Sequence, residues 1–124
     1  MEKDSSSHYI LIIDDDQNQV NTLRDIFVLE NLRVTAVTSA REALQLLEKE
    51  TFHLVLSDIR MKEINGVELT RLVKRDYPDT PVILMTAYAS ENFILESIQA
   101  GALVTMSKPL DIPHLIDQVN RLLG

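Results

Sequence analysis

The residues most capable of chemistry in this sequence stand at the ends of short apolar runs. Carboxylates, a hydroxyl and an ammonium group each close or follow such a run: Asp14, Asp15 and Asp16 after YILII, Asp58 at the end of LVLSD, Thr86 at the end of VILMT, and Lys108 shortly after LVTM. Short, β-branched apolar runs are typical of buried strands. If these strands are parallel, their carboxyl ends share one edge of a sheet, where open α/β sheets bind ligands.

Grouped carboxylates favour a hard divalent cation here, because no histidine stands at these strand ends to suggest zinc. Several carboxylates close together cannot all stay ionised without a compensating cation, and their oxygens select Mg²⁺ or Ca²⁺ over softer metals. Few protein ligands suit Mg²⁺, which keeps waters and shares phosphate oxygens. Lys108 offers a positive charge and Thr86 a donor for a phosphoryl oxygen. A lone aspartate, Asp58, is the natural nucleophile for a phosphoryl group.

The elements that must position these groups alternate along the chain. Apolar runs predict strands over residues 9–14, 33–38, 54–58, 82–86 and 103–106. Apolar residues at helical spacing predict helices over residues 17–30, from the capping box at 39–42 onward, and over 67–77, 92–100 and 112–123. Strict alternation predicts a doubly wound α/β domain, a five-stranded parallel sheet with helices on both faces. Asp15 or Asp16 is expected to cap the first helix, which is the purely structural explanation for aspartates there.

Length and composition fit one globular domain. The chain has 124 residues, of which 45% are hydrophobic and 25% charged. The polar residues 1–8 predict a disordered leader and leave residues 9–124 as the domain. A net charge of −7 predicts no direct contact with nucleic acid, and no apolar run approaches the roughly 18 residues that span a membrane. The absence of cysteine excludes disulfides and thiol catalysis and fits a cytoplasmic protein.

Five short motifs in this order resemble those of the receiver domains of two-component response regulators. They are IIDDD at 12–16, LSDIRM at 56–61, NG at 65–66, MTAY at 85–88 and SKP at 107–109. LSDIRM and MTAY are similar to receivers of the nitrogen-regulator type, which usually precede an ATPase and a DNA-binding domain. The resemblance covers residues 9–123 and implies a CheY-like, flavodoxin-like fold with strand order 2-1-3-4-5. It also implies a regulatory phosphoacceptor rather than a turnover enzyme, with a role in phosphorelay signalling and transcription regulation.

The resemblance assigns the acidic residues to a phosphoacceptor and a magnesium site. Asp58 matches the phosphoacceptor and also a metal ligand. Asp14 and Asp15 match the acidic pair that binds Mg²⁺, with Asp15 as the expected direct ligand. The backbone carbonyl of Arg60 would be a further ligand.

The basic and hydroxyl groups receive roles from the same resemblance. A sensor histidine kinase or histidine phosphotransfer protein would donate its phosphoryl group to Asp58. Lys108 would neutralise the phosphoryl oxygens, and Thr86 matches the hydroxyl that moves towards the phosphoryl group and switches the domain. The bond from Lys108 to Pro109 is expected to be cis.

The sequence departs from the family pattern near the predicted site. Thr105 stands where the family usually has an aromatic residue coupled to the threonine, so the aromatic switch is absent or replaced. Lys62 and Glu63 replace a common Pro-Gly pair. Arg60 and Tyr88 flank the site and are expected to tune slow hydrolysis of the acyl phosphate.

Three further predictions concern an apolar patch, a glycine and the histidines. Phe93, Leu95 and Val104 are expected to form an apolar patch on the fourth helix and fifth strand, which the last helix completes as a contact for a partner or a second copy. Gly66 is expected to be a positive-φ loop residue. The three histidines at positions 8, 53 and 114 are scattered and are read as ordinary surface or loop residues without a metal role.

Two other functions compete with the phosphorylated switch. A small flavodoxin-like enzyme or cofactor binder is disfavoured, because three glycines leave no glycine-rich phosphate loop. A degenerate receiver that binds partners without phosphorylation would share the fold. Asp14, Asp15, Asp58 and Lys108 argue against it, whereas Thr105 keeps it open.

Overall fold

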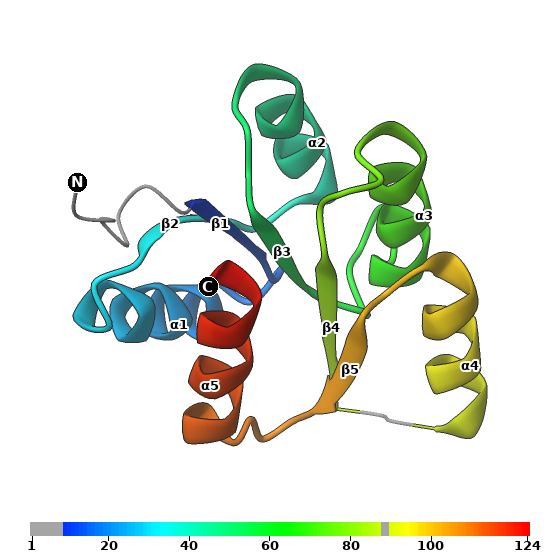
Figure 1. Cartoon of the computed structure of the whole chain (residues 1–124). Helices are drawn as coiled ribbons and strands as arrows, with labels where there is room; N and C mark the ends of the chain where they lie inside the picture. The colour runs from blue at the N-terminus through cyan, green and yellow to red at the C-terminus, as the bar shows by residue number, and fades with distance from the viewer. Residues whose placement is uncertain (1–8, 88–89) are drawn as a thin grey trace.

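Five short strands form the centre of the protein. The computed structural model describes residues 9–87 and 90–124. Its strands are β1 (Tyr9–Ile13), β2 (Arg33–Val37), β3 (Leu54–Asp58), β4 (Val82–Thr86) and β5 (Val104–Ser107). All neighbours pair in parallel, in the order β2-β1-β3-β4-β5. The predicted sheet and strand order are therefore confirmed (Figure 1).

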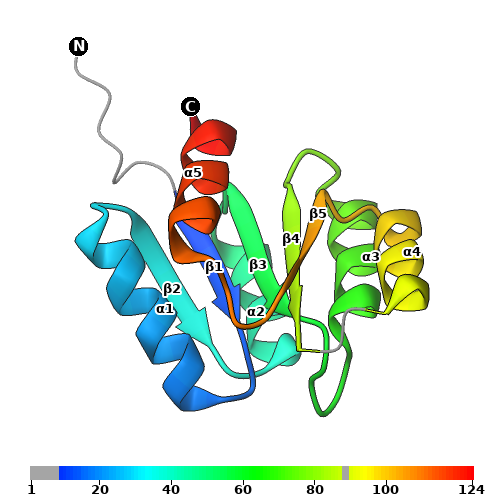
Figure 2. The same cartoon turned by 90° about the horizontal axis from the view of Figure 1, so that it is seen from below.

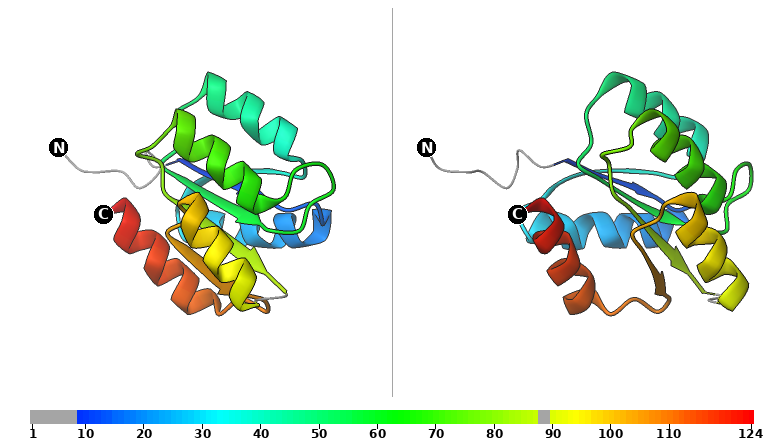
Figure 3. Two further views of the ribbon diagram at one scale, coloured as in Figure 1. Left: turned by 90° about the vertical axis from the view of Figure 1, so that its right-hand side faces the viewer. Right: turned by 45° about the vertical axis from the view of Figure 1, so that its right-hand side comes forward.

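The helices cover both faces of the sheet. They are α1 (Gln17–Leu29), α2 (Ala40–Lys49), α3 (Gly66–Asp76), α4 (Glu91–Ala100) and α5 (Ile112–Leu123). Helices α1 and α5 lie on one face, and α2, α3 and α4 lie on the other (Figures 2 and 3). This arrangement follows from parallel pairing, since each return to the starting edge needs a crossover helix.

The central strands are apolar at every position because both of their faces are covered. In β1, Ile10 and Ile12 enter the core beneath α1 and α5, whereas Leu11 and Ile13 enter the core beneath α2 and α3. All four side chains are fully buried. The edge strand β2 carries only one buried residue, Val37, which agrees with its less apolar sequence.

Side-chain caps fix where the helices start. Asp16, rather than Asp15, caps α1 by accepting from the backbone N–H groups of Asn18 and Gln19. Ser39 caps α2 as predicted, because its hydroxyl accepts from the backbone N–H of Glu42 at 3.0 Å, which is the first of the two bonds of a capping box. These caps satisfy donors that have no partner inside the helix. The cis bond before Pro109 is also confirmed.

The predicted apolar patch differs from the one observed. Of its three expected members only Leu95 is exposed, because Phe93 and Val104 are half-buried against the two different cores. The exposed large apolar side chains of α4 are instead Ile94, Leu95 and Ile98, called the α4 patch below. These residues share one side of the helix by their spacing of three and four.

Within the described ranges, no helix has the length and apolar character needed to cross a membrane. Tyr88, which was expected to flank the site, and the leader predicted over residues 1–8 lie outside the described residues.

Candidate phosphoryl and metal site

Three carboxylates meet at the carboxyl ends of β1 and β3. Ligand oxygens of Asp14, Asp15 and Asp58 all lie within 4.8 Å of one another. Asp14 and Asp58 are buried, whereas Asp15 is exposed. The predicted convergence of these strand ends is therefore present, although 42 residues of sequence or more separate Asp58 from the other two.

Local hydrogen bonds hold Asp14 in this position. Its carboxylate accepts from the backbone N–H of Asp16 at 2.9 Å, and its own N–H donates to the carbonyl of Val37 at 3.2 Å. The first contact forms a tight turn directly after β1. Asp14 and Asp15 thus take different environments, with Asp14 fixed in the interior and Asp15 at the surface.

The ammonium group of Lys108 lies between the two buried carboxylates. Its Nζ is 2.9 Å from Oδ2 of Asp14 and 3.3 Å from Oδ2 of Asp58. A third contact, 2.6 Å to Oε1 of Gln19, was not predicted from the sequence. The backbone N–H of Lys108 donates to the carbonyl of Thr86 at 2.8 Å, which fixes the lysine against the end of β4.

Thr86 and Arg60 flank the carboxylates. Thr86 is buried at the end of β4, opposite Ser107 of β5 in register and one position beyond the partner of Asp58. Arg60 lies two residues after Asp58, and its side chain is exposed. Among the residues that the structure describes, Asp14, Asp15, Asp58, Arg60, Thr86 and Lys108 therefore lie at one edge of the sheet.

Burial and charge act in opposite directions on this site. Burial raises the pKa of Asp58 above its ordinary value, the charge of Lys108 lowers it, and the neighbouring Asp14 raises it again, so that the net pKa is raised. For Lys108, burial lowers the pKa, but the hydrogen bond and charge of Asp14, followed by those of Asp58, raise it overall. The lysine is therefore a fixed positive charge, and the site stays rich in negative charge.

Comparison with known proteins assigns the family. The model of the response regulator receiver domain matches residues 10–120. This chain belongs to that family. It is 37% identical over 112 residues to the response regulator protein FleR of Pseudomonas aeruginosa, covering 90% of this chain and 24% of FleR. It is 36% identical over 106 residues to the transcriptional regulatory protein ZraR of Escherichia coli, covering 86% of this chain and 24% of ZraR.

A solved relative carries a metal and a phosphoryl mimic. The response regulator protein TrrA of Thermotoga maritima, in complex with Mg²⁺-BeF, is 28% identical with a TM-score of 0.84, and the match covers 93% of this chain and 98% of TrrA. The receiver domain described here spans about a quarter of its two curated relatives, FleR and ZraR. It is a regulatory phosphoacceptor domain of the two-component type.

The residues of the receiver domain fit a hard divalent cation. Asp14, Asp15 and Asp58 offer only oxygen atoms, and their mutual distances of up to 4.8 Å allow one ion to contact more than one of them. Their grouped negative charge exceeds the single charge of Lys108. A second cation would therefore relieve the repulsion among the carboxylates.

Gly66 has a different role from the predicted one. It is not at positive φ but forms the first residue of α3, where its N–H donates to the carbonyl of Ile59 at 2.8 Å. A Cβ on Gly66 would lie 2.4 Å from the carbonyl oxygen of Asp58 and 2.9 Å from Cα of Ile59. The position requires glycine because two backbone segments approach closely, and this contact supports the end of β3, which carries Asp58.

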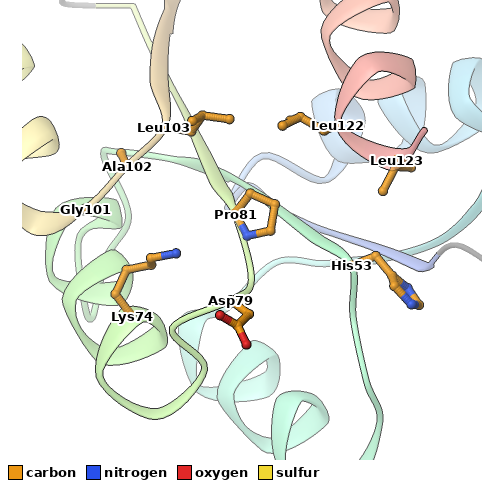
Figure 4. Close-up of a pocket in the computed structure, with 9 residues that line it drawn as sticks. All are labelled: His53, Lys74, Asp79, Pro81, Gly101, Ala102, Leu103, Leu122 and Leu123. Atoms are coloured by element: carbon orange, nitrogen blue, oxygen red, sulfur yellow. The ribbon is translucent and has the colours of Figure 1, made fainter.

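A separate cavity of about 590 Å³ lies at the opposite end of the sheet. Figure 4 shows His53, Lys74 and Asp79 at its wall, next to residues that precede β4 and β5. The ammonium of Lys74 donates to the carbonyls of Pro78 and Thr80, both at 2.9 Å, and Nδ1 of His53 accepts from a backbone N–H at 2.9 Å. Lys74 and His53 thus bond backbone groups, His53 is an exposed loop residue as predicted, and the cavity lies away from the acidic site.

Proposed function

We propose that Asp58 accepts a phosphoryl group from a phosphohistidine of a sensor kinase or phosphotransfer protein. The position of Lys108 carries this proposal, because its ammonium contacts Asp14 and Asp58 while the carboxylate of Asp15 lies within 4.8 Å of both. Such a site combines a nucleophile, a fixed positive charge and oxygen ligands for a cation, which are the parts that phosphoryl transfer needs. The Mg²⁺-BeF complex of TrrA supports the same assignment.

The residues act by position and charge. A carboxylate oxygen of Asp58 forms a bond to phosphorus while the bond from phosphorus to the imidazole nitrogen of the donor breaks. Lys108 donates to a phosphoryl oxygen, since its contact to Asp58 already directs an N–H towards the acceptor. Asp14, Asp15, Asp58 and the carbonyl of Arg60 would hold Mg²⁺, which neutralises charge on the phosphoryl group when bound.

The phosphoryl group would then change the conformation of the domain. Thr86 is buried beside the acceptor at the end of β4, so a bond from its hydroxyl to the phosphoryl group would pull the segment after β4 inward. Slow hydrolysis of the acyl phosphate would reset the switch, and Arg60 and Tyr88 are the proposed residues that tune it. Exchange with a sensor kinase implies a cytoplasmic location.

Incubation with a small phosphodonor and Mg²⁺, followed by intact mass measurement, tests the proposal. The wild-type domain should gain one phosphoryl group, and Asp58→Asn should not. Asp79→Asn is a matched control because this aspartate lies in the cavity at the opposite end of the sheet. Full labelling of Asp58→Asn, or failure of the wild-type domain to accept any phosphoryl group, would overturn the assignment.

We further propose that the output lies in other parts of a longer protein and concerns transcription. The chain spans 24% of ZraR, a transcriptional regulatory protein. The net charge of −7 gives this domain no electrostatic attraction to DNA. The receiver domain would therefore control transcription through domains that it contacts rather than by binding DNA itself.

The α4 patch is the proposed contact with a second copy of the domain. Leu95 and Ile98 are 56% and 61% exposed, which is unusual for adjacent large apolar side chains on one helix. Sedimentation with and without beryllofluoride should show an increase in mass on activation. Ile98→Asp should prevent it, whereas the neighbouring exposed Gln99→Asp should not. A wild-type domain that stays monomeric in both states would refute self-association.

A further inference from the structure

The shortest contact of the Lys108 ammonium group is made by a neutral side chain, Gln19. Its Oε1 lies 2.6 Å from Nζ of Lys108, compared with 2.9 Å for Asp14 and 3.3 Å for Asp58. Gln19 lies in the first turn of α1, 89 positions before Lys108 in the sequence. The contact therefore connects the start of α1 to the segment that follows β5.

The amide of Gln19 has a defined orientation. Its Nε2 donates to Oδ2 of Asp16 at 3.4 Å, and its backbone N–H donates to Oδ1 of the same residue at 3.2 Å. Lysine can only donate hydrogen bonds, so the oxygen of the amide must face Lys108. The N-cap residue Asp16 therefore holds the nitrogen end of the amide, and Lys108 holds the oxygen end.

Three acceptors match the three N–H groups of an ammonium ion. Asp14 and Gln19 make the two shorter contacts, and the contact with Asp58 is the longest. With two N–H groups held, the third points at the carboxylate that accepts the phosphoryl group. Because Gln19 is neutral, it fixes this geometry without adding another negative charge to a site that already has three carboxylates.

We propose that Gln19 is a positioning residue that orients Lys108 for phosphoryl transfer. The inference rests on the proposed role of Asp58 as phosphoacceptor and adds a residue that the sequence alone did not indicate. Gln19 acts through Lys108 and does not itself contact the phosphoryl group or the metal. Its loss should slow transfer while leaving the affinity for Mg²⁺ unchanged.

Two glutamines on the same turn allow a matched test. Gln19→Met removes the acceptor at nearly constant size. Gln17→Met makes the same change at an exposed residue whose amide bonds Asn21 instead. Phosphorylation by a small phosphodonor at saturating Mg²⁺ should slow about five- to tenfold in Gln19→Met, the effect of losing one solvent-exposed hydrogen bond. It should stay unchanged in Gln17→Met, in which the contact between Gln19 and Lys108 remains.

A double-mutant cycle separates this role from a general structural one. The readout is the dissociation constant of beryllofluoride in the presence of Mg²⁺, measured for Gln19→Met, Lys108→Met and the double variant. Gln19→Met should weaken binding in the wild-type background and have no further effect without Lys108. An equal loss in both backgrounds would overturn the proposal, as would wild-type phosphorylation of Gln19→Met. A wild-type domain that accepts no phosphoryl group would instead refute the proposed function itself.

Discussion

Replacing Gly66 by alanine should destabilise the receiver domain, contrary to the usual effect of this substitution. Gly66 is the first residue of α3 and has an ordinary negative φ, so helix propensity alone predicts a gain of about 0.4–1 kcal/mol. The added Cβ, however, would lie 2.4 Å from the carbonyl oxygen of Asp58 and 3.1 Å from its carbonyl carbon. Both are backbone atoms, which cannot rotate out of the way.

The expected cost follows from the contacts that must change. Moving the start of α3 away from Asp58 costs about 1–3 kcal/mol of overpacking strain. It also stretches the 2.8 Å hydrogen bond from Gly66 to Ile59, which contributes about 1 kcal/mol. After the gain in helix propensity, the net loss is about 2 kcal/mol, or roughly 8 °C in Tm for a domain of this size.

Urea unfolding and phosphorylation rates, measured on the same samples, test this reasoning. Gly101→Ala is the matched comparison, because Gly101 has a φ of 105° and lies at the opposite end of the sheet. It should lose about 1 kcal/mol of stability from backbone strain but keep its rate of phosphorylation. Gly66→Ala should lose stability and should also be phosphorylated more slowly, since its clash displaces the backbone of Asp58 at the end of β3. A Gly66→Ala variant that is as stable as the wild type would refute the close-approach explanation.

Three further predictions concern the charges of the site. Without divalent metal, Asp58→Asn should be more stable than the wild type near neutral pH, because the raised pKa of Asp58 means that its ionisation opposes folding. This difference should shrink as the pH falls below the raised pKa of the folded state and vanish below the ordinary pKa of an aspartate, and Mg²⁺ should reverse it. Lys108→Met should lose about 3 kcal/mol of unfolding free energy, measured with urea, since it leaves the buried Asp14 without its ion-pair partner. Mg²⁺ should restore part of this loss, and a variant as stable as the wild type would contradict the pairing. Asp16→Ala should lose about 1 kcal/mol of unfolding free energy, because the N-cap of α1 is removed. It should still bind Mg²⁺ with the affinity of the wild type in calorimetry, and a lost affinity would show that Asp16 is a metal ligand.

Much of the fold and site could be predicted because strand ends are visible in the sequence. The apolar runs before Asp14, Asp58 and Thr86 end where the observed strands end, to within one residue. Parallel pairing then dictates that these ends share an edge. Lys108 follows the same rule through β5, so its approach to Asp58 depends on topology rather than on details of side-chain packing.

The remaining features depend on distances that no local pattern encodes. Gly66 looks like a turn glycine in the sequence, because the close approach of α3 to Asp58 appears only when both segments are folded. The Gln19 contact has no local signal either. The patch prediction failed for a simpler reason. Val104 and the buried Met106 are two positions apart on β5, so their side chains point to the same face of the sheet, where both meet the core beneath α1 and α5.

A structure of the domain with Mg²⁺ and beryllofluoride would test the proposed site most directly. The beryllium should bond to a carboxylate oxygen of Asp58, the ammonium of Lys108 should lie within hydrogen-bonding distance of a fluoride, and the metal should contact Asp15, Asp58 and the carbonyl of Arg60. Beryllofluoride attached to another carboxylate, or Lys108 turned away from it, would contradict the proposed chemistry of these residues.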